Sequence, residues 1–247
     1  MLPVVDLEII RWPGLLDYEE GVALQRAYRA DVVAGRSPGV VVLCEHPSVY
    51  TAGRRTEPSD LPTDGSPVVE ADRGGRITWH GPGQLVAYPI VRLAEPLDVV
   101  AWVRDLEQVV LDTAASLGLA AERVPGRSGV WLPRAGGDGA GVGGTHDKVG
   151  AIGLHVAEHV SSHGIAINCD NDLAPYAAIV PCGIADAGVT TLSRAAGRHV
   201  TVDEVAAAVG HRIERAVEGM RTGARISTTG LTGPSSTPAP DRQEIPA

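Results

Sequence analysis

Apolar and polar residues alternate along the chain with two different periods, and each period predicts a different kind of element. Alternation at a period of two, or a short wholly apolar run, predicts strands at 3–12, 39–47, 68–70, 77–79, 85–90, 129–132, 149–156 and 164–168. Apolar residues at helical spacing predict helices at about 18–33, 97–118 and 201–219. Because strands and helices do not alternate strictly, the order predicts a domain of the α+β class.

The two later helices carry residues that typically begin or end a helix. Asp98 is placed to cap the helix at 97–118, and Gly118 is placed to end it. Thr201 and Glu204 have the spacing of a capping box at the start of the last helix. The apolar stripe expected on the helix at 97–118 consists of Ala101, Val109, Val110, Thr113 and Leu117.

Two segments lack the apolar pattern of a packed domain. Residues 134–147 are rich in glycine and predict a mobile surface loop. Residues 226–247 are rich in Ser, Thr and Pro and predict a disordered tail. We therefore expect a single folded domain over residues 1–225, with the loop at 134–147 inside it.

The composition of the chain favours some classes of protein and argues against others. Of the 247 residues, 44% are hydrophobic and 21% are charged, as in soluble globular proteins. The formal net charge of -9 argues against a general nucleic-acid binder, which would need a basic face. The three cysteines form no CxxC pair, so no disulfide framework is expected. Without a long apolar run or a secretory signal pattern, we expect a cytoplasmic protein with no membrane attachment.

Lys148 is the only lysine in the chain, which carries 21 Lys and Arg residues in all. A surface lysine can become arginine at little cost, but only lysine exchanges its proton at an accessible pH. The stretch KVGAIGLHV around it is apolar, and desolvation favours the neutral amine. Lys148 is therefore a candidate acid and base; the alternative is a chance survivor of a composition bias at a strand edge.

A lysine that transfers protons needs a partner, and the cysteines are the candidate nucleophiles. Cys44 and Cys169 lie in apolar strands, where core packing is the better interpretation. Cys182 differs because it stands between Pro181 and Gly183, on a turn that leaves backbone N–H groups free to hold an oxyanion. A cationic lysine beside Cys182 would favour its thiolate.

The stretch RGGRITWHGPGQLVAYPI, residues 73–90, holds glycines at a density that lets the backbone approach a ligand closely. We expect Ile77, Trp79, His80 and Gln84 to line a slot for an apolar tail with a polar mouth. The alternative is a tight hairpin with structural glycines. The stretch matches neither GxGxxG nor a Walker loop, so the pattern does not predict phosphate binding.

Three histidines follow one another at a spacing of four, His155, His159 and His163. On a helix this spacing would form a metal-binding face. The residues Ile152, Leu154 and Val156 alternate at strand period instead, and the stretch SSHG is typical of a turn. We therefore expect no metal site.

Taken together, these residues resemble the octanoyltransferases of lipoic acid synthesis, the lipoyl(octanoyl) transferases that share a fold with lipoate and biotin protein ligases. The resemblance runs from about residue 5 to 220 and depends on six stretches in family order, CEHPSVYTAGR, RGGRITWHGPGQLVAYPI, GVWL, KVGAIGLHV, SSHGIAINCDNDLAPYAAIVPCGI and VTTLS. It implies an α+β fold with a mixed sheet core and packed helices, forming one catalytic acyltransferase domain. Departures are Trp79 where the family usually has Tyr, Tyr176 where it often has Phe, and a longer glycine-rich stretch before Lys148.

The resemblance also implies an activity and a site. An octanoyl or lipoyl group would pass from acyl carrier protein to a lysine of a lipoyl domain, in 2-oxoacid dehydrogenase complexes or in the H protein of glycine cleavage. It would pass through a thioester on Cys182, with Lys148 as the other member of a Cys/Lys dyad, without cofactor or metal, in a monomeric enzyme. The substrate-contacting residues implied are Arg73, Gly74, Gly75, Arg76, Ile77, Thr78, Trp79, His80, Ala151, Ile152, Gly153, Gly164, Ile165 and Ala166.

The acidic charge of this chain bears on the donor, because acyl carrier proteins are acidic as a family. Attraction between the two proteins must come from local arginines. We expect Arg54, Arg55, Arg73 and Arg76, which lie close together in the sequence, to dock the carrier.

The sequence is also compatible with three other functions. An ATP-dependent lipoate or biotin protein ligase would share the fold but needs no nucleophilic cysteine, and Cys182 argues against it. An amidotransferase that moves octanoyl between lipoyl domains would differ only in its donor. A non-catalytic acyl-binding module would bind fatty acyl chains without a covalent adduct.

Overall fold

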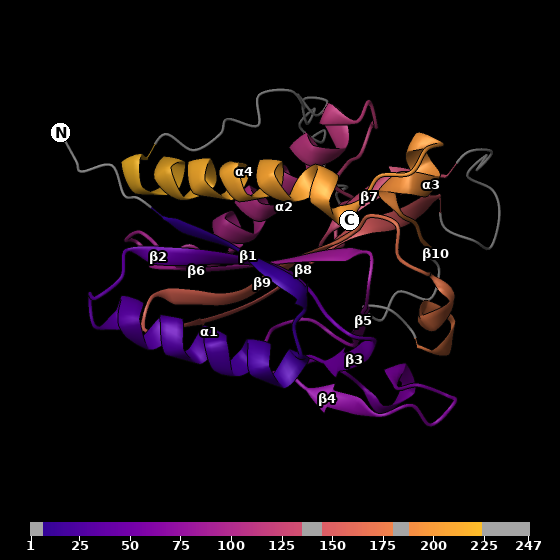
Figure 1. Ribbon diagram of the computed structural model, residues 1–247, viewed down its shortest axis with the longest axis horizontal. Coiled ribbons are helices and arrows are strands. Elements are labelled where there is room, and N and C mark those ends of the chain that lie inside the picture. The colour runs from indigo at the N-terminus through magenta and orange to yellow at the C-terminus, as the bar shows by residue number, and fades with distance from the viewer. Residues whose placement is uncertain (1–6, 135–144, 180–187, 224–247) are drawn as a thin grey trace, which may run out of the picture.

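Helices cover both faces of one large sheet in the computed structural model, which describes residues 7–134, 145–179 and 188–223 (Figure 1). The strands are β1 (Glu8–Leu15), β2 (Gly39–Glu45), β3 (Val49–Ala52), β4 (Val68–Glu70), β5 (Thr78–His80), β6 (Gln84–Val91), β7 (Val130–Pro133), β8 (His146–Ala157), β9 (Val160–Asn168) and β10 (Gly188–Val189). The helices are α1 (Tyr18–Val33), α2 (Val99–Ser116), α3 (Leu192–Ala196) and α4 (Val202–Thr222), with 3-10 turns at Pro58–Asp60 and Ala174–Ala178.

The large sheet contains both parallel and antiparallel pairs. Its strand order is β1-β2-β6-β9-β8-β10, and β7 pairs with β8. β1 runs parallel to β2 and β10 parallel to β8, whereas β2, β6, β9 and β8 pair antiparallel. A small sheet, β4-β3-β5, lies beside the large one on the side of α1 (Figure 1). The predicted α+β class, with a mixed sheet and packed helices, is confirmed.

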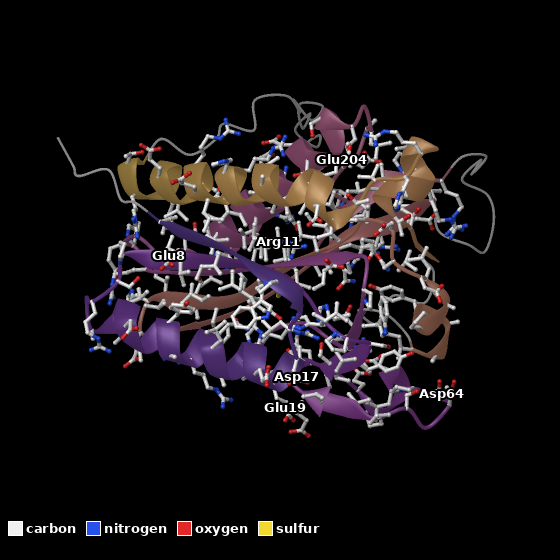
Figure 2. All side chains as sticks on the ribbon, in the orientation of Figure 1. Glu8, Arg11, Asp17, Glu19, Asp64 and Glu204 are labelled. Carbon is white, nitrogen blue, oxygen red and sulfur yellow. The ribbon has the colours of Figure 1, made fainter. Side chains whose placement is uncertain are left out.

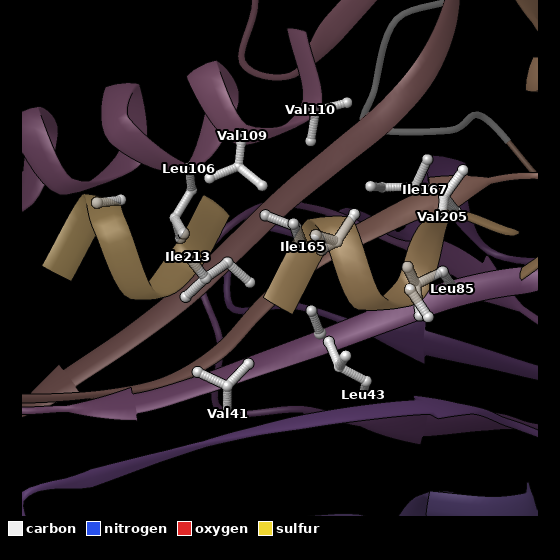
Figure 3. Close-up of a cluster of buried hydrophobic side chains, with 14 of the residues drawn as sticks. Val41, Leu43, Leu85, Leu106, Val109, Val110, Ile165, Ile167, Val205 and Ile213 are labelled. Carbon is white, nitrogen blue, oxygen red and sulfur yellow. The ribbon is translucent and has the colours of Figure 1, made fainter. Parts of the chain in front are cut away.

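Alternation along the central strands gives the large sheet two different faces. Leu85 of β6 and Ile165 and Ile167 of β9 join the largest core cluster, with α2 and α4 packed over them (Figure 3). Val86 and Ala166, one residue further along each strand, belong to a second buried cluster on the side of α1. The second face carries the candidate site.

Capping side chains begin the three long helices. The Asp17 carboxylate accepts from the backbone N–H groups of Glu19 and Glu20 at the start of α1 (Figure 2). Asp98 caps α2 as predicted, accepting from the N–H of Ala101. Thr201 caps α4 as predicted, accepting from the N–H of Glu204. The Glu204 carboxylate accepts from the Arg198 guanidinium, so Glu204 forms an ion pair with a residue that precedes the helix.

The buried stripe of α2 is partly the predicted one. Val109, Val110 and Thr113 are buried as predicted, but Ala101 and Leu117 are only partly buried. Trp102 and Leu106 are fully buried in their place. Positions 102, 106, 109, 110 and 113 follow i, i+4, i+7, i+8 and i+11 spacing, so the stripe has the predicted centre but begins at Trp102 instead of Ala101.

Other differences lie at the ends of elements. β8 begins at His146, so the end of the predicted loop at 134–147 belongs to a strand. The reason is that β7 and β8 pair as far as Pro133 and His146, and Arg134 forms an ion pair with Asp147. Residues 135–144 of this loop and residues 224–247, with the predicted tail, lie outside the described residues. Within the described ranges, no helix is both long enough and apolar enough to cross a membrane.

Candidate active site

A pocket of about 50 Å³ lies between the α1 face of the large sheet and the segment 73–80. Of the 14 predicted substrate-contacting residues, 11 line it and 3 do not. The 11 are Arg73, Gly75, Arg76, Thr78, His80, Ala151, Ile152, Gly153, Gly164, Ile165 and Ala166. Four small residues of the adjacent strands β8 and β9, Ala151, Gly153, Gly164 and Ala166, leave room above the sheet.

The other 3 predicted contacts do not line the pocket, for local reasons. Ile77 and Trp79 point away from it into a separate buried cluster with Tyr50 and Tyr176, because side chains alternate along β5 and only Thr78 and His80 face the sheet. The expectation that Ile77 and Trp79 line the slot was therefore wrong. Gly74 docks the segment by its backbone, donating its N–H to the Leu154 carbonyl at 2.8 Å.

Arg73 is a buried brace of this segment. Its guanidinium donates to the carbonyl and hydroxyl oxygens of Thr51, both at 2.7 Å, and to the carbonyls of Gly74 and Arg76. Arg76 is held by two carboxylates, Asp60 at 2.7 Å and Glu57 at 2.6 Å. The prediction that Arg73 docks a partner at the surface was wrong, because its guanidinium is used inside the fold.

Lys148 lies at one end of the same slot. A second pocket is lined by Thr78, Gln84, Lys148, Gly150, Ala151, Ala166, Asn168, Tyr176 and Val189. Thr78, Ala151 and Ala166 line both pockets, so the two form one slot along β8 and β9. Lys148 is 7% exposed, which agrees with the burial expected from its apolar neighbours.

Two groups fix the position of the Lys148 ammonium. Nζ lies 4.5 Å from the ring centroid of the buried Trp131, within the range of a cation–π contact. Gly129 lies on another side, so close that a Cβ there would stand 3.4 Å from Nζ. The N–H of Gly129 donates to the fully buried carboxylate of Glu107, which also pairs with Arg123. The backbone behind Lys148 is thereby anchored to α2.

A polar network of buried side chains borders the slot near Lys148. Burial lowers the pKa of His80 to about 3, so its ring is neutral at physiological pH. Its Nδ1–H donates to Gln84 Oε1 at 2.7 Å, which leaves Nε2 as an acceptor. The Gln84 amide in turn donates to Asn168 Oδ1 and to the Tyr176 hydroxyl, both at 2.9 Å. Tyr176 therefore uses the hydroxyl that a phenylalanine would lack.

Cys182, the predicted nucleophile, lies outside the described residues, as do Pro181 and Gly183. The described residues on either side of 180–187 lie against the site. Val189 pairs with Lys148 in the sheet, and Ile179 packs in the cluster that contains Trp79 and Tyr176.

The two other cysteines are unsuited to nucleophilic catalysis. Cys44 and Cys169 are fully buried, and burial raises the pKa of each thiol to about 12. They therefore stay protonated at physiological pH. The prediction that both are packing residues is confirmed.

Four residues that line the first pocket were not predicted, Tyr18, Val86, Tyr88 and His163. A period-two pattern from Gln84 to Tyr88 could have found two of them, since these residues share one face of β6. No signal in the sequence connects Tyr18, at the start of α1, with this site.

His155 lies on β8, as its strand-period neighbours predicted, but the prediction of a turn at SSHG was wrong, because β9 begins at Val160 and pairs these residues with β8. His155 and His163 therefore lie on adjacent strands, and both bind Asp72. His163 Nε2 and His155 Nδ1 lie 2.6 and 2.8 Å from its two carboxylate oxygens. His159 lies apart, in the turn between β8 and β9, where it pairs with Glu95. In the part of the chain that the structure describes, no His, Cys, Asp and Glu side chains form a group that could hold a metal ion.

Comparisons with known proteins agree with this architecture. The fold resembles that of a bi-partite lipoate protein ligase from Thermoplasma acidophilum, with a TM-score of 0.61 at 14% identity over 87% of this chain and 84% of that one. It also resembles a biotin protein ligase from Aquifex aeolicus, with a TM-score of 0.53 at 16% identity over 87% of this chain and 72% of that one. These similarities show the fold alone.

Other proteins are much more similar to this chain in sequence than these structural neighbours are. An octanoyltransferase of Clavibacter sepedonicus is 62% identical over 188 residues, 76% of this chain and 80% of that protein. An octanoyltransferase of Mycobacterium sp. (strain KMS) is 53% identical over 223 residues, 90% of this chain and 89% of that protein. Residues 17–214 match the family model described as the lipoyl protein ligase A/B catalytic domain. The chain therefore belongs to the lipoyl protein ligase A/B catalytic-domain family, in which it groups with the octanoyltransferases and is an acyltransferase.

Proposed function

We propose that this enzyme transfers an octanoyl or lipoyl group from acyl carrier protein to a lysine of lipoyl domains, through a thioester on Cys182. The observation that carries the proposal is the slot itself. Its floor consists of small residues on β8 and β9, and one end of it reaches the only lysine of the chain, Lys148. An acyl chain lying on this floor would present its carbonyl carbon near Lys148.

The proposed reaction has two halves. In the first, the Cys182 thiolate attacks the carbonyl carbon of the acyl thioester, and the carbon–sulfur bond to the pantetheine arm breaks. Lys148 gives its proton to the departing pantetheine sulfur. In the second half, neutral Lys148 takes a proton from the amine of the acceptor lysine. That amine attacks the acyl-enzyme, which forms the amide and releases the Cys182 thiolate.

The surroundings of Lys148 support this role. Trp131 and Gly129 hold its amine at the end of the slot, where it is largely shielded from water. Arginine at this position would keep the charge but could not release a proton. A guanidinium is also larger than an ammonium, and it would have to fit between Trp131 and the backbone of Gly129.

The proposed partners follow from the family. The relatives are named octanoyltransferases, and one structural neighbour was solved as part of an archaeal lipoylation system with its E2 lipoyl domain. Lipoyl domains are therefore the proposed acceptors. A carrier-protein donor fits an enzyme with a nucleophilic cysteine, because a thioester already carries the activated acyl group. We take the active form to be a monomer.

Two exposed arginines are the proposed carrier-docking residues. Arg54 and Arg55 lie at the surface beside the segment that braces the slot, and the Arg54 N–H donates to the Arg73 carbonyl. Arg73 is excluded by its burial, and the charge of Arg76 is offset by Asp60 and Glu57. Replacing both Arg54 and Arg55 with Ala is expected to raise the KM for the carrier and flatten its salt dependence. An unchanged KM and salt slope would remove them from the docking surface.

The experiment that tests the proposed function measures octanoyl transfer from the carrier protein to a lipoyl domain, without ATP. Wild type is expected to be active, and Lys148→Arg to lose at least about 100-fold in kcat, the lower range for a lost acid–base group. Cys182→Ser should be similarly impaired. Transfer that requires ATP would identify a ligase instead, and near-normal turnover by Lys148→Arg would remove the proton-transfer role.

A further inference from the structure

Aromatic side chains line the slot on the side away from Lys148. Tyr88 of β6, Tyr18 at the start of α1 and His163 of β9 line the first pocket but not the second. β6 pairs with β9 as far as Ala87 and Ile165, and this register, which the bridge between Arg92 and Val160 continues, sets Tyr88 opposite Gly164. A chain that enters beside Lys148 and follows the small residues of β9 therefore meets the ring of Tyr88.

Hydrogen bonds hold this ring in place. The Tyr88 hydroxyl lies 2.6 Å from His46 Nε2, and His46 Nδ1 lies 2.6 Å from the Leu16 carbonyl. Burial lowers the pKa of His46 and raises that of Tyr88, so both are neutral at physiological pH. The His46 Nδ1–H then donates to Leu16, and Nε2 accepts from Tyr88. The Tyr88 ring also packs edge-on against His163, with centroids 6.3 Å apart.

The depth of the slot follows from the strand geometry. On β9, Asn168 lines the Lys148 end and Gly164 lies beside Tyr88, four residues away. Four residues of strand span about 13 Å. A medium-chain acyl group with its carbonyl at Lys148 fits into such a length, whereas each further methylene would overlap the Tyr88 ring.

We propose that Tyr88, held by His46, is the specificity-determining residue that limits the acyl group to medium length. The proposal deepens the proposed function and rests on it, since it requires an acyl chain whose carbonyl lies at Lys148. It also gives a role to His46 of the CEHP stretch, as a positioning residue for the end wall.

The test compares acyl carrier protein loaded with chains of six to fourteen carbons. For each chain, the acyl-enzyme is quantified by intact mass, and kcat/KM is measured for transfer to a lipoyl domain. Tyr88→Ala opens space for about two further methylenes, each worth about fourfold in binding. We expect the ratio of kcat/KM for the ten-carbon over the eight-carbon chain to rise by about 15-fold. Tyr88→Leu retains an apolar side chain at this position and should destabilise the fold less than Tyr88→Ala does. It should raise the same ratio by a smaller factor than Tyr88→Ala.

Two matched variants serve as controls. Tyr88→Phe keeps the ring and removes the hydrogen bond that positions it against His46, so its length preference should shift toward longer chains much less than that of Tyr88→Ala. Tyr28→Ala removes a tyrosine that packs against the same buried cluster outside the slot, and should leave the ratio unchanged. Because the readout is a ratio, a general loss of stability lowers both rates and does not move it.

The outcomes separate this proposal from the function on which it rests. Absence of an acyl-enzyme on wild type with every chain length contradicts the proposed function. An acyl-enzyme on wild type, with Tyr88→Ala and Tyr88→Leu keeping the wild-type preference, overturns the end wall alone. A shift in Tyr88→Phe as large as in Tyr88→Ala also overturns it, because the ring would then not be the limiting group.

Discussion

Filling the slot at Ala166 tests its acyl-binding role without touching the proposed chemistry. Ala166 is buried on β9 and lines the slot where its two pockets meet. Leucine at this position adds three carbon atoms in the space proposed for the acyl chain. Ala166→Leu should therefore exclude the middle of an octanoyl group while Lys148 and Cys182 remain unchanged.

The size of the effect follows from the buried area. Each methylene that the slot no longer holds costs about 0.8 kcal/mol of binding free energy. Three displaced methylenes cost about 2.4 kcal/mol, which corresponds to a loss of about 60-fold in kcat/KM for octanoyl transfer. Ala166→Val, with two added carbons, should lose less.

The assay measures kcat/KM for octanoyl and butyryl carrier protein with one lipoyl domain, together with Tm. The butyryl substrate is the internal control, because a short chain reaches less far into the slot and should be affected less. Ala157→Leu is the matched variant, on β8 outside both pockets. Octanoyl transfer by Ala166→Leu within about twofold of wild type, at unchanged Tm, would refute the acyl-binding role of the slot.

Three further predictions concern groups that support the site. Glu107→Ala should lower the free energy of unfolding in urea by about 3 kcal/mol, since it breaks buried pairs to Arg123 and to the Gly129 N–H, and a change below about 1 kcal/mol would contradict this. Gly129→Ala should reduce octanoyl transfer more than tenfold, because φ there is +109° and the new Cβ would crowd the Gly150 carbonyl and Lys148. Wild-type turnover by Gly129→Ala would show that this backbone does not position Lys148. Burial alone would raise the pKa of Asp72, but hydrogen bonds from His163 and His155 lower it to about 2, below its usual 3.8. A carboxyl group whose pKa is lowered by folding stabilises the fold above its unfolded-state pKa, and this stabilisation is lost as the pH falls. The Tm of wild type should therefore fall more steeply than that of Asp72→Asn between about pH 4 and pH 2. Parallel curves of Tm against pH for the two proteins would contradict this prediction.

The helices illustrate what periodicity alone can predict. The range 18–33 predicted for the first helix is that of α1, and Asp98 and Thr201 cap α2 and α4 as expected. These features depend on residues close together in the sequence. α3, a short helix after the undescribed segment, was not predicted, because five residues carry too little periodic signal.

The residues of the site were harder to predict from the sequence than the helices were. β6 is buried along its whole length, so its burial alone does not show which residues face the slot. Tyr88 was missed although it follows the predicted Gln84 at a period of two. Ile77 and Trp79 are apolar beside a slot for an apolar chain, yet they face a different cluster, because both sides of β5 are buried. Arginine is usually a surface residue, and only the fold shows that the Arg73 guanidinium is buried and binds Thr51. The substrate contacts that were predicted on β8 and β9, residues 151–153 and 164–166, came from the family resemblance.

The most direct test of the account is the intact mass of the enzyme after mixing with octanoyl carrier protein in the absence of acceptor. We predict that wild type gains the mass of one octanoyl group, that the adduct maps to Cys182, and that Cys182→Ser gains none. Addition of a lipoyl domain should return wild type to its original mass as the domain becomes octanoylated. Transfer through a thioester on Cys182 would be contradicted if Cys182→Ser octanoylated the lipoyl domain at the wild-type rate. It would also be contradicted if wild type octanoylated the domain without ever carrying the adduct.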